Sequence, residues 1–530
     1  MMRAATGGPV RHGSLVVPRG STLRLGGGIH LITAVPSLWP RLTPSHRPDQ
    51  RSWPSSLAWL ACLAALAVFL ACAPLTWAAA ALVGVAFLAL VAIRPVVALV
   101  ALAIALPFGD LRPLPLLLTL PLAGANLVDL LVLLALLAWL ARGVARRQIV
   151  IRWPRLAIPI LVLLWIMGLT LTQAVSWRDG LPEWLKWAEF ACLYLLASQT
   201  LAGRARWWVI GALFVAGLAE VALGAYQFIR QVGPEAFILN GRFMRAYGTF
   251  RQPNPYAGYL GYLAPVAASL ALAGLGCWWR ERRRADLYIG LAGSGVTLAL
   301  AAGIGMSWSR GAWLGLGAAL LVVVALRSRR TAALTAAGLL LVLFALTLFG
   351  TGWLPRSIVA RLGDLGGLAS DLDPAHTEIT DENFAVLERL AHWQAAERMF
   401  DDHPWLGVGI GNYAAAYPAY AQPHWYDPLG HAHNVYLNFL AETGSLGLGA
   451  FVVFWLAAAW LAARVAWRHP PRPGGSASIR AAYLPALAVG VLGTLTYCTV
   501  HNIFDNLFVA HMQLQLALLL AALAAEPGAA

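Results

Sequence analysis

The chain has 530 residues, of which 59% are hydrophobic and only 12% are charged, and its mean hydropathy is +0.67. Soluble domains contain about 45–50% apolar and about 25% charged residues, so this composition excludes a soluble enzyme, a disordered chain and a fibrous protein. It indicates a polytopic membrane protein. The net charge of +14 comes with arginines clustered between apolar runs, which favours membrane topology over nucleic-acid binding.

The first segment, residues 1–55, is rich in glycine, proline and arginine. It contains no apolar run long enough, beside its charges, to form the core of a signal peptide. We therefore expect a basic cytoplasmic tail without fixed structure. The five cysteines of the chain contain no CxxC pair, so we infer neither a metal site nor a disulfide framework from them.

From Leu57 onward, apolar runs recur almost without pause. At about 20 residues for each crossing, they predict an all-α bundle of 12–14 membrane spans. The expected helices cover 57–77, 78–93, 95–109, 125–141, 156–175, 184–201, 207–228, 255–275, 287–306, 311–326, 331–349, 434–463, 481–500 and 507–525. They divide the chain into an N-terminal bundle at 56–230, segments that carry arginine motifs at 231–349, and C-terminal spans at 434–530.

The arginines orient this stack. If the N-terminus is cytoplasmic, most arginines fall in loops on the cytoplasmic side, as membrane proteins prefer. An even number of spans then makes both termini cytoplasmic.

One connection, residues 350–433, is much longer than the others, and this topology places it outside. It holds 11 of the 24 acidic residues. A loop of this length within a compact bundle is usually functional or disordered. Apolar residues between Phe384 and Phe400 recur near helical spacing, and a proline- and glycine-rich stretch starts at Pro404. We expect a large extracytoplasmic loop that is partly helical and packed.

The expected topology places three polar segments on the same outer face: 242–260, 307–311 and 431–447. Short outer loops usually avoid arginine, yet the first two segments keep arginines beside glycine, proline and asparagine. A guanidinium presents a planar fork that matches phosphate oxygens, and the N-termini expected at Pro255 and Gly311 add free N–H groups. These features predict a partner with concentrated negative charge, such as a phosphate or diphosphate.

Each of these residues also has a structural interpretation. Arg242 and Arg251 fit solvated loop charges, and Arg310 fits a residue that extends toward lipid headgroups. The spacing of His431 and His433 does not define a metal site, because zinc needs further ligands. Within the spans, Asp129, Glu189 with Lys186, and Glu220 fit either a proton relay or polar contacts between helices. His501 and Asp505 are candidates for a supporting shell.

The order of RAYGTFRQPNPYAGYL, SWSRGAWLGLG, HPWLGVGIGNY and HAHNVYLNFLAETGSLGLG resembles the O-antigen ligase and polymerase superfamily, over about residues 240–465. The resemblance implies an all-helical glycosyltransferase of the bacterial inner membrane that works on the periplasmic face without metal or other cofactor. Its donor would be a glycan on undecaprenyl diphosphate and its acceptor a lipid or glycan. The implied catalytic residues are Arg245, Arg310 and His433. The candidate substrate-binding residues are Arg251, Asn254, Asn434, Glu442 and Trp405.

In the mechanism that we expect, Arg245 and Arg310 clamp the diphosphate, and His433 accepts the proton of the attacking hydroxyl with inversion at the anomeric carbon. The loop would act as a lid, with Trp405, Trp425 and Tyr426 as stacking surfaces. Ligation onto a lipid core, polymerisation and transfer to a protein all fit the same residues. An alternative from another class is a transporter for a small anion such as bicarbonate, although its charges would be expected near the membrane midplane.

Overall fold

The computed structural model describes the chain in several stretches. These are residues 64, 68, 72, 74–109, 126–147, 149, 151–239, 241, 243–349, 372–380, 383–468 and 479–525. The chain forms two units, Met1–Arg41 and Leu42–Ala530, and every described residue belongs to the second. The predicted tail at 1–55, the first part of the long loop and Arg242 lie outside the described residues.

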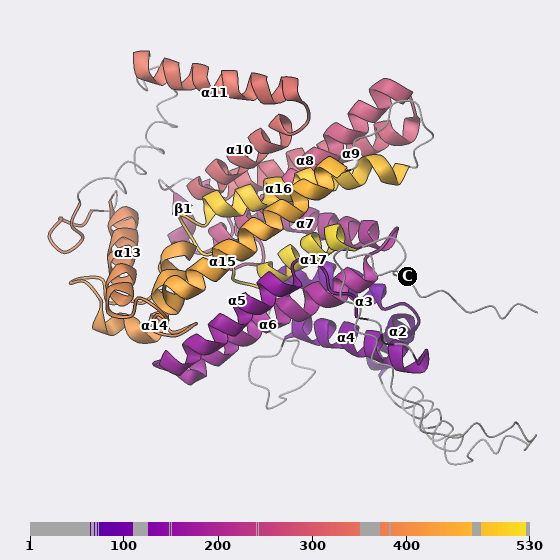
Figure 1. Ribbon diagram of the computed structural model, residues 1–530, viewed down its shortest axis with the longest axis horizontal. Coiled ribbons are helices and arrows are strands. Elements are labelled where there is room, and N and C mark those ends of the chain that lie inside the picture. The colour runs from indigo at the N-terminus through magenta and orange to yellow at the C-terminus, as the bar shows by residue number, and fades with distance from the viewer. Residues whose placement is uncertain are drawn as a thin grey trace, which may run out of the picture. The chain divides into compact units, whose positions relative to one another are not determined.

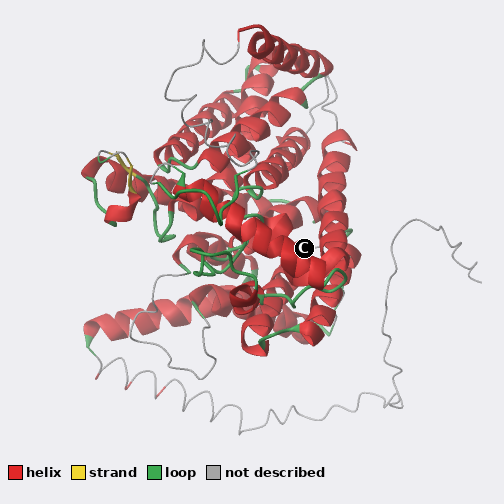
Figure 2. Cartoon of the chain, turned by 90° about the vertical axis from the view of Figure 1, so that its left-hand side faces the viewer, coloured by secondary structure: helices red, strands yellow, loops and turns green. Residues whose placement is uncertain are grey.

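The described part is almost entirely helical, with one pair of two-residue strands, as Figure 2 shows. Its helices outside the long loop are α2 (Leu75–Ile93), α3 (Val96–Ala105), α4 (Leu127–Ala145), α5 (Ala157–Thr170), α6 (Trp177–Thr200), α7 (Ala205–Arg230), α8 (Pro253–Glu281), α9 (Arg284–Met306), α10 (Arg310–Ala325), α11 (Arg329–Phe349), α15 (Val435–Arg468), α16 (Ile479–His501) and α17 (Met512–Ala524). Strands β1 (Ile238–Leu239) and β2 (Phe243–Met244) form an antiparallel hairpin. The long loop contributes α13 (Phe384–Asp402) and α14 (Tyr413–Ala416).

The predicted fold class, an all-α polytopic bundle, is confirmed. Seven of the described helices are long and apolar enough to cross a membrane, and four shorter apolar helices accompany them. Several bounds differ from the prediction. The break expected between 77 and 78 does not occur, because residues 75–93 form one helix, and α6 starts at Trp177 rather than at 184.

Helices α8 and α9 pack closely because small residues face each other. A side chain at Gly274 would meet the backbone of Gly290, and one at Gly293 would meet Ala271. Such close approach is the usual basis of helix packing in lipid, where apolar burial gives no advantage over lipid tails. Helix α16 packs against both α8 and α10.

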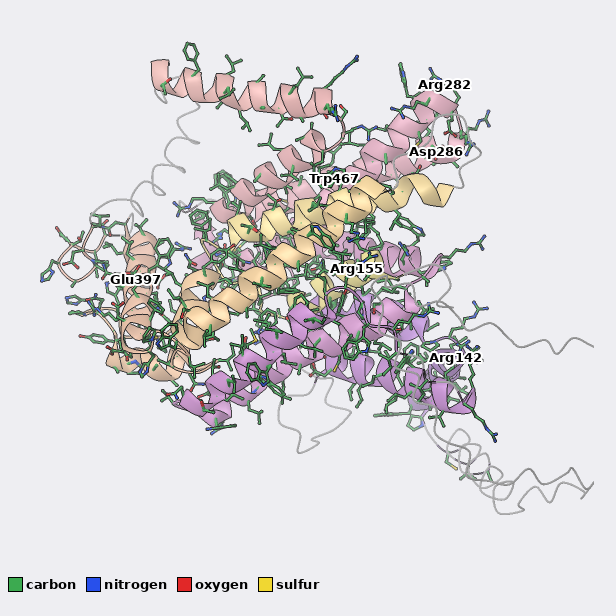
Figure 3. The ribbon with its side chains drawn as sticks, viewed as in Figure 1. Arg142, Arg155, Arg282, Asp286, Glu397 and Trp467 are labelled. Atoms are coloured by element: carbon green, nitrogen blue, oxygen red, sulfur yellow. The ribbon has the colours of Figure 1, made fainter. Side chains whose placement is uncertain are left out.

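Hydrogen bonds between distant residues sort the helix ends into two groups. One group is joined by Arg142 to Ile93, Arg152 to Gln199, Arg206 to Ala525 and Tyr483 to Asp286. The other is joined by Thr249 to Pro107, Asn126 to His511, Ser309 to His501 and Val435 to Asn502. Figure 3 shows Arg142 and Arg282 at one end and Glu397 of the long loop at the other. The helices therefore alternate in direction as the arginine pattern predicts.

The long loop is packed onto the second end, beside the start of α15 (Figure 1). Helix α15 kinks at Gly444, where φ is 62° and ψ is −167°. The kink exposes backbone groups that the loop uses: Val408 N–H donates to Ala441 O at 2.9 Å and Ser445 N–H donates to Pro404 O at 2.8 Å. The predicted partly helical loop is thus confirmed in its described part, and its glycine-rich motif docks on the kink.

Candidate active site

Arg245 follows the hairpin β1–β2 and lies half-buried between two helix ends. Its Nε donates to Ser307 O at 2.9 Å, and one terminal nitrogen donates to Asn254 Oδ1 at 3.1 Å. The backbone N–H of Ala246 also donates to Met306 O at 3.0 Å. The guanidinium is thus held between the start of α8 and the end of α9, next to the predicted Ser-Arg-Gly segment.

The turn after Arg245 is fixed by two side chains from α7. Gln227 Oε1 accepts from the backbone N–H groups of Tyr247 and Gly248, and Glu220 accepts from the backbone and hydroxyl of Thr249. Glu220 is therefore a backbone anchor, which favours the structural interpretation of this residue. Arg251 ends the turn with φ of 59° and is exposed.

Arg310 is the first residue of α10 and is half-buried. The turn before it is tightened by Ser307, whose hydroxyl accepts from Ser309 N–H at 3.1 Å. The Ser309 hydroxyl lies 3.4 Å from Nε2 of His501, at the end of α16. Arg245 and Arg310 therefore stand on the two sides of one short turn, which α16 supports.

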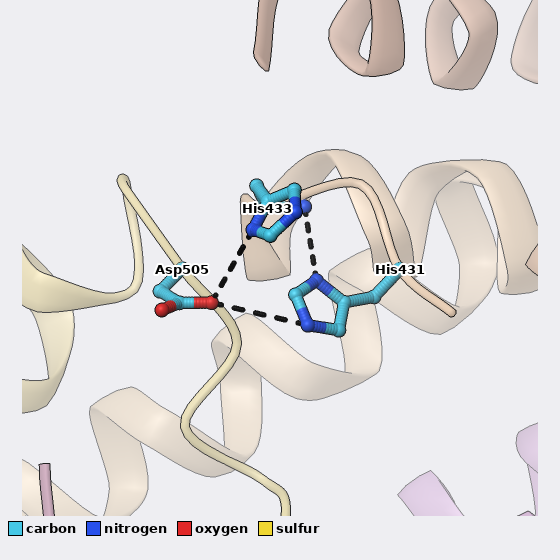
Figure 4. A group of neighbouring side chains, drawn as sticks. All are labelled: His431, His433 and Asp505. Atoms are coloured by element: carbon cyan, nitrogen blue, oxygen red, sulfur yellow. Dashed lines mark hydrogen bonds and ion pairs between the residues drawn. The ribbon is translucent and has the colours of Figure 1, made fainter. Parts of the chain in front are cut away.

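His433 lies in a strained turn, with φ of 51°, just before α15. Its Nδ1 is 3.6 Å from Asp505 Oδ1, and Nε2 of His431 is 3.9 Å from the same oxygen (Figure 4). Both ring nitrogens of His433 are buried, and no hydrogen-bond partner for them exists among the described residues. With Nδ1 facing a carboxylate, the neutral ring keeps its proton there and leaves a lone pair on Nε2.

Burial would raise the pKa of Asp505, but contact with His433 and the proximity of His431 and His501 hold it well below its usual range. The neighbouring imidazoles stay neutral. Burial and the proximity of His433 lower the pKa of His431 and of His392, on α13, to about 4 each. Asp505 is thus an ionised carboxylate shared by His431 and His433.

Among the described residues, two groups of side chains have the composition of a metal site: His431 with His433 and Asp505, and Asp129 with Glu189 and His511. In the first group, His431 Nδ1 accepts the backbone N–H of His433 at 3.1 Å. The neutral ring must then carry its proton on Nε2, the atom that faces Asp505, and a protonated nitrogen is not a ligand. This hydrogen bond would have to break before a metal could bind.

The remaining candidate substrate-binding residues lie in different parts of the structure. Asn434 caps α15, accepting from the backbone N–H groups of Tyr436 and Leu437, and Glu442 accepts from Tyr413 N–H at 3.1 Å. Both therefore hold the backbone around His433 and the loop. Trp405 is 68% exposed and lies on the loop surface, whereas Trp425 is buried against Pro374 O and offers no stacking surface.

Contacts thus connect the three predicted catalytic residues. Arg245 donates to Ser307, in the turn that leads to Arg310. Ser309 of that turn contacts His501 at the end of α16, and the connection from α16 to α17 places Asp505 beside His433. Residue Arg389 on α13, which sequence reasoning did not single out, lies close enough for the charges of Asp505 and Arg310 to act on it.

Comparison with known families finds one match. Residues 295–452, from within α9 to within α15, match a family described as O-antigen ligase. This range contains Arg310, Arg389 and His433, but neither Arg245 nor Asp505. A comparison with curated proteins gives no significant match.

Proposed function

We propose that this chain, a member of the O-antigen ligase and polymerase superfamily through residues 295–452, transfers a glycan from a polyprenyl diphosphate to an acceptor hydroxyl. Membership of this superfamily indicates a multi-pass membrane protein that takes part in polysaccharide biosynthesis. The observation that carries the proposal is the Asp505–His433 pair, on the same end of the bundle as Arg245 and Arg310.

In this proposal the two arginines bind the diphosphate of the donor. Charge develops on the phosphate oxygen as its bond to the anomeric carbon breaks, and fixed guanidinium groups stabilise that charge. Arg245 is suited to this role because Ser307 and Asn254 hold its orientation before the donor arrives. Polyprenyl diphosphate is the leaving group.

His433 is the proposed general base. Its Nε2 takes the proton of the acceptor hydroxyl while the new C–O bond forms on the face opposite the leaving group, which inverts the anomeric centre. Asp505 holds Nδ1–H and stabilises the imidazolium that results, as carboxylates do in other Asp–His pairs. The two arginines neutralise the leaving group, so we expect the step to need no metal.

The same site serves ligation and polymerisation, which differ in the acceptor, and transfer to a protein is a variant of the same chemistry. The transporter alternative is less favoured, because the arginines and His433 gather at one end of the bundle rather than near the middle of the spans.

The test is glycan transfer in membranes that contain equal amounts of wild type, Arg310→Ala or His433→Ala. We expect both variants to lose transfer by at least about 100-fold. Full activity in both would remove the proposed site. In a deletion strain, unattached lipid-linked chains indicate a ligase, and a single unit on the acceptor indicates a polymerase. Unchanged glycans with lost anion uptake into vesicles would indicate the transporter.

A further inference from the structure

We propose that Arg389, on the loop helix α13, is a third guanidinium ligand of the donor diphosphate. This inference rests on the proposed function, since it concerns the same donor site. It gives the long loop a direct part in binding the donor, beyond covering it.

The first observation is that Arg389 has a buried N–H donor without an acceptor. One terminal nitrogen of its guanidinium donates to Ala385 O, one helical turn earlier, at 2.8 Å. Nε is buried, and the described residues offer it no acceptor. Leaving a buried donor unused is costly, so the persistence of this one indicates a place for an acceptor that arrives later.

The second observation is the charge around Arg389. Burial lowers the pKa of Arg389, the charges of Asp505 and Glu388 oppose that effect, and the charge of Arg310 reinforces it. Arg389 therefore lies near a second guanidinium, that of Arg310, and near the carboxylate of Asp505, which also faces His433 and His431. Like charges in a partly desolvated place repel each other, and a diphosphate would relieve that repulsion.

The third observation is the direction of α13. His392, almost one turn after Arg389, places its ring 5.8 Å from that of His433 in an edge-to-face contact. Residues three apart share a helix face. The face of α13 that carries Arg389 and His392 is therefore the one turned toward His433, beside the start of α15 (Figure 1).

The experiment measures binding of inorganic pyrophosphate to the purified full chain in lipid nanodiscs. We expect Arg389→Gln to weaken binding at least tenfold and Arg389→Lys to weaken it less. Arg398→Gln is the matched control, because Arg398 is exposed on the same helix. In transfer assays Arg389→Gln should raise the KM for the donor more than it lowers kcat, and added methylguanidinium should partly restore activity to Arg389→Ala.

The outcomes separate the two proposals. Equal binding by wild type and Arg389→Gln, with similar thermal unfolding, overturns the role of Arg389 and leaves the proposed function standing. No pyrophosphate binding by wild type overturns both. If Arg389→Gln unfolds, Arg389→Lys decides the question: a melting temperature like that of wild type with unchanged pyrophosphate affinity and unchanged donor KM also overturns the role.

Discussion

His433 depends on a single carboxylate for its orientation, and this makes Asp505 a residue to test. Asp505→Asn keeps the size of the side chain but offers an amide in place of the carboxylate beside His433 Nδ1. The neutral ring can then place its proton on Nε2, which removes the lone pair needed by a general base. We expect kcat for glycan transfer to fall by about 100-fold or more, measured in membranes with equal protein.

The matched control for this prediction is Asp401→Asn, an exposed acidic residue at the end of α13. It should leave kcat unchanged. Wild-type kcat in Asp505→Asn would show that His433 does not need the carboxylate.

For single residues, the sequence predicted those that lie in compact motifs, and it missed Arg389, which does not lie in one. Arg245, Arg310 and His433 each belong to a short polar segment at an expected helix end, so topology alone brought them to one face. Asp505 was only a supporting candidate. Arg389 is one of several charged residues within a helix that was predicted from its apolar spacing, and helices commonly carry such charges on solvated faces. Only its burial reveals it.

Among the elements, the kink of α15 is the one on which loop docking depends. Gly444 has φ of 62°, and a side chain there would meet the backbone of Trp405 and Leu406. Gly444→Ala should therefore destabilise the docked loop by more than about 2 kcal/mol, through backbone strain and steric overlap. The measurement is the rate of limited proteolysis within the loop, with the purified chain in nanodiscs.

Gly449→Ala provides the control, since this glycine lies on the same helix with open space around its Cβ position. Alanine there should be neutral or slightly stabilising, by about 0.5–1 kcal/mol. Equal proteolysis of the two variants would mean that the kink does not hold the loop.

The packed loop should also respond to acid. Burial, with the charges of His433 and His431, lowers the pKa of His392 to about 4, while the unfolded chain keeps an ordinary value near 6.5. Between these values the unfolded state binds more protons, so the stability of the loop falls as the pH falls from about 6.5 to 4. His431 adds in the same direction. Thermal unfolding across this range should show a melting temperature that declines with acid.

His392→Phe should reduce this decline, because it removes one buried imidazole and keeps a ring to stack on Tyr417, whose ring centroid lies 4.7 Å from that of His392. His403→Phe, at an exposed histidine of the same loop, should leave the decline as in wild type. A slope that His392→Phe does not alter would exclude His392 as the source.

For the whole molecule, hydropathy and arginine placement predicted the helical bundle and the alternation of its helices. They did not predict how the loop packs. Its hydrogen bonds join residues far apart in the chain, such as Ile410 N–H to the Thr170 hydroxyl and Ser176 N–H to Asn412. Such contacts depend on the positions of helices that local periodicity does not encode. The start of α6 differs for a similar reason, since hydropathy detects the apolar stretch and not the polar turns at 177–183 that extend it.

The orientation of the molecule in the membrane follows from the charge at its two ends. The end with Arg142 and Arg282 should face the cytoplasm, and the end with Glu397 should face outward (Figure 3). In a variant whose five native cysteines are replaced by alanine, Glu397→Cys should react with an impermeant maleimide in intact spheroplasts. Arg282→Cys should react only after the membrane is opened, and both positions are exposed. The reverse pattern would put Arg245, Arg310 and His433 on the cytoplasmic side, where a glycan donor that has already crossed the membrane could not reach them.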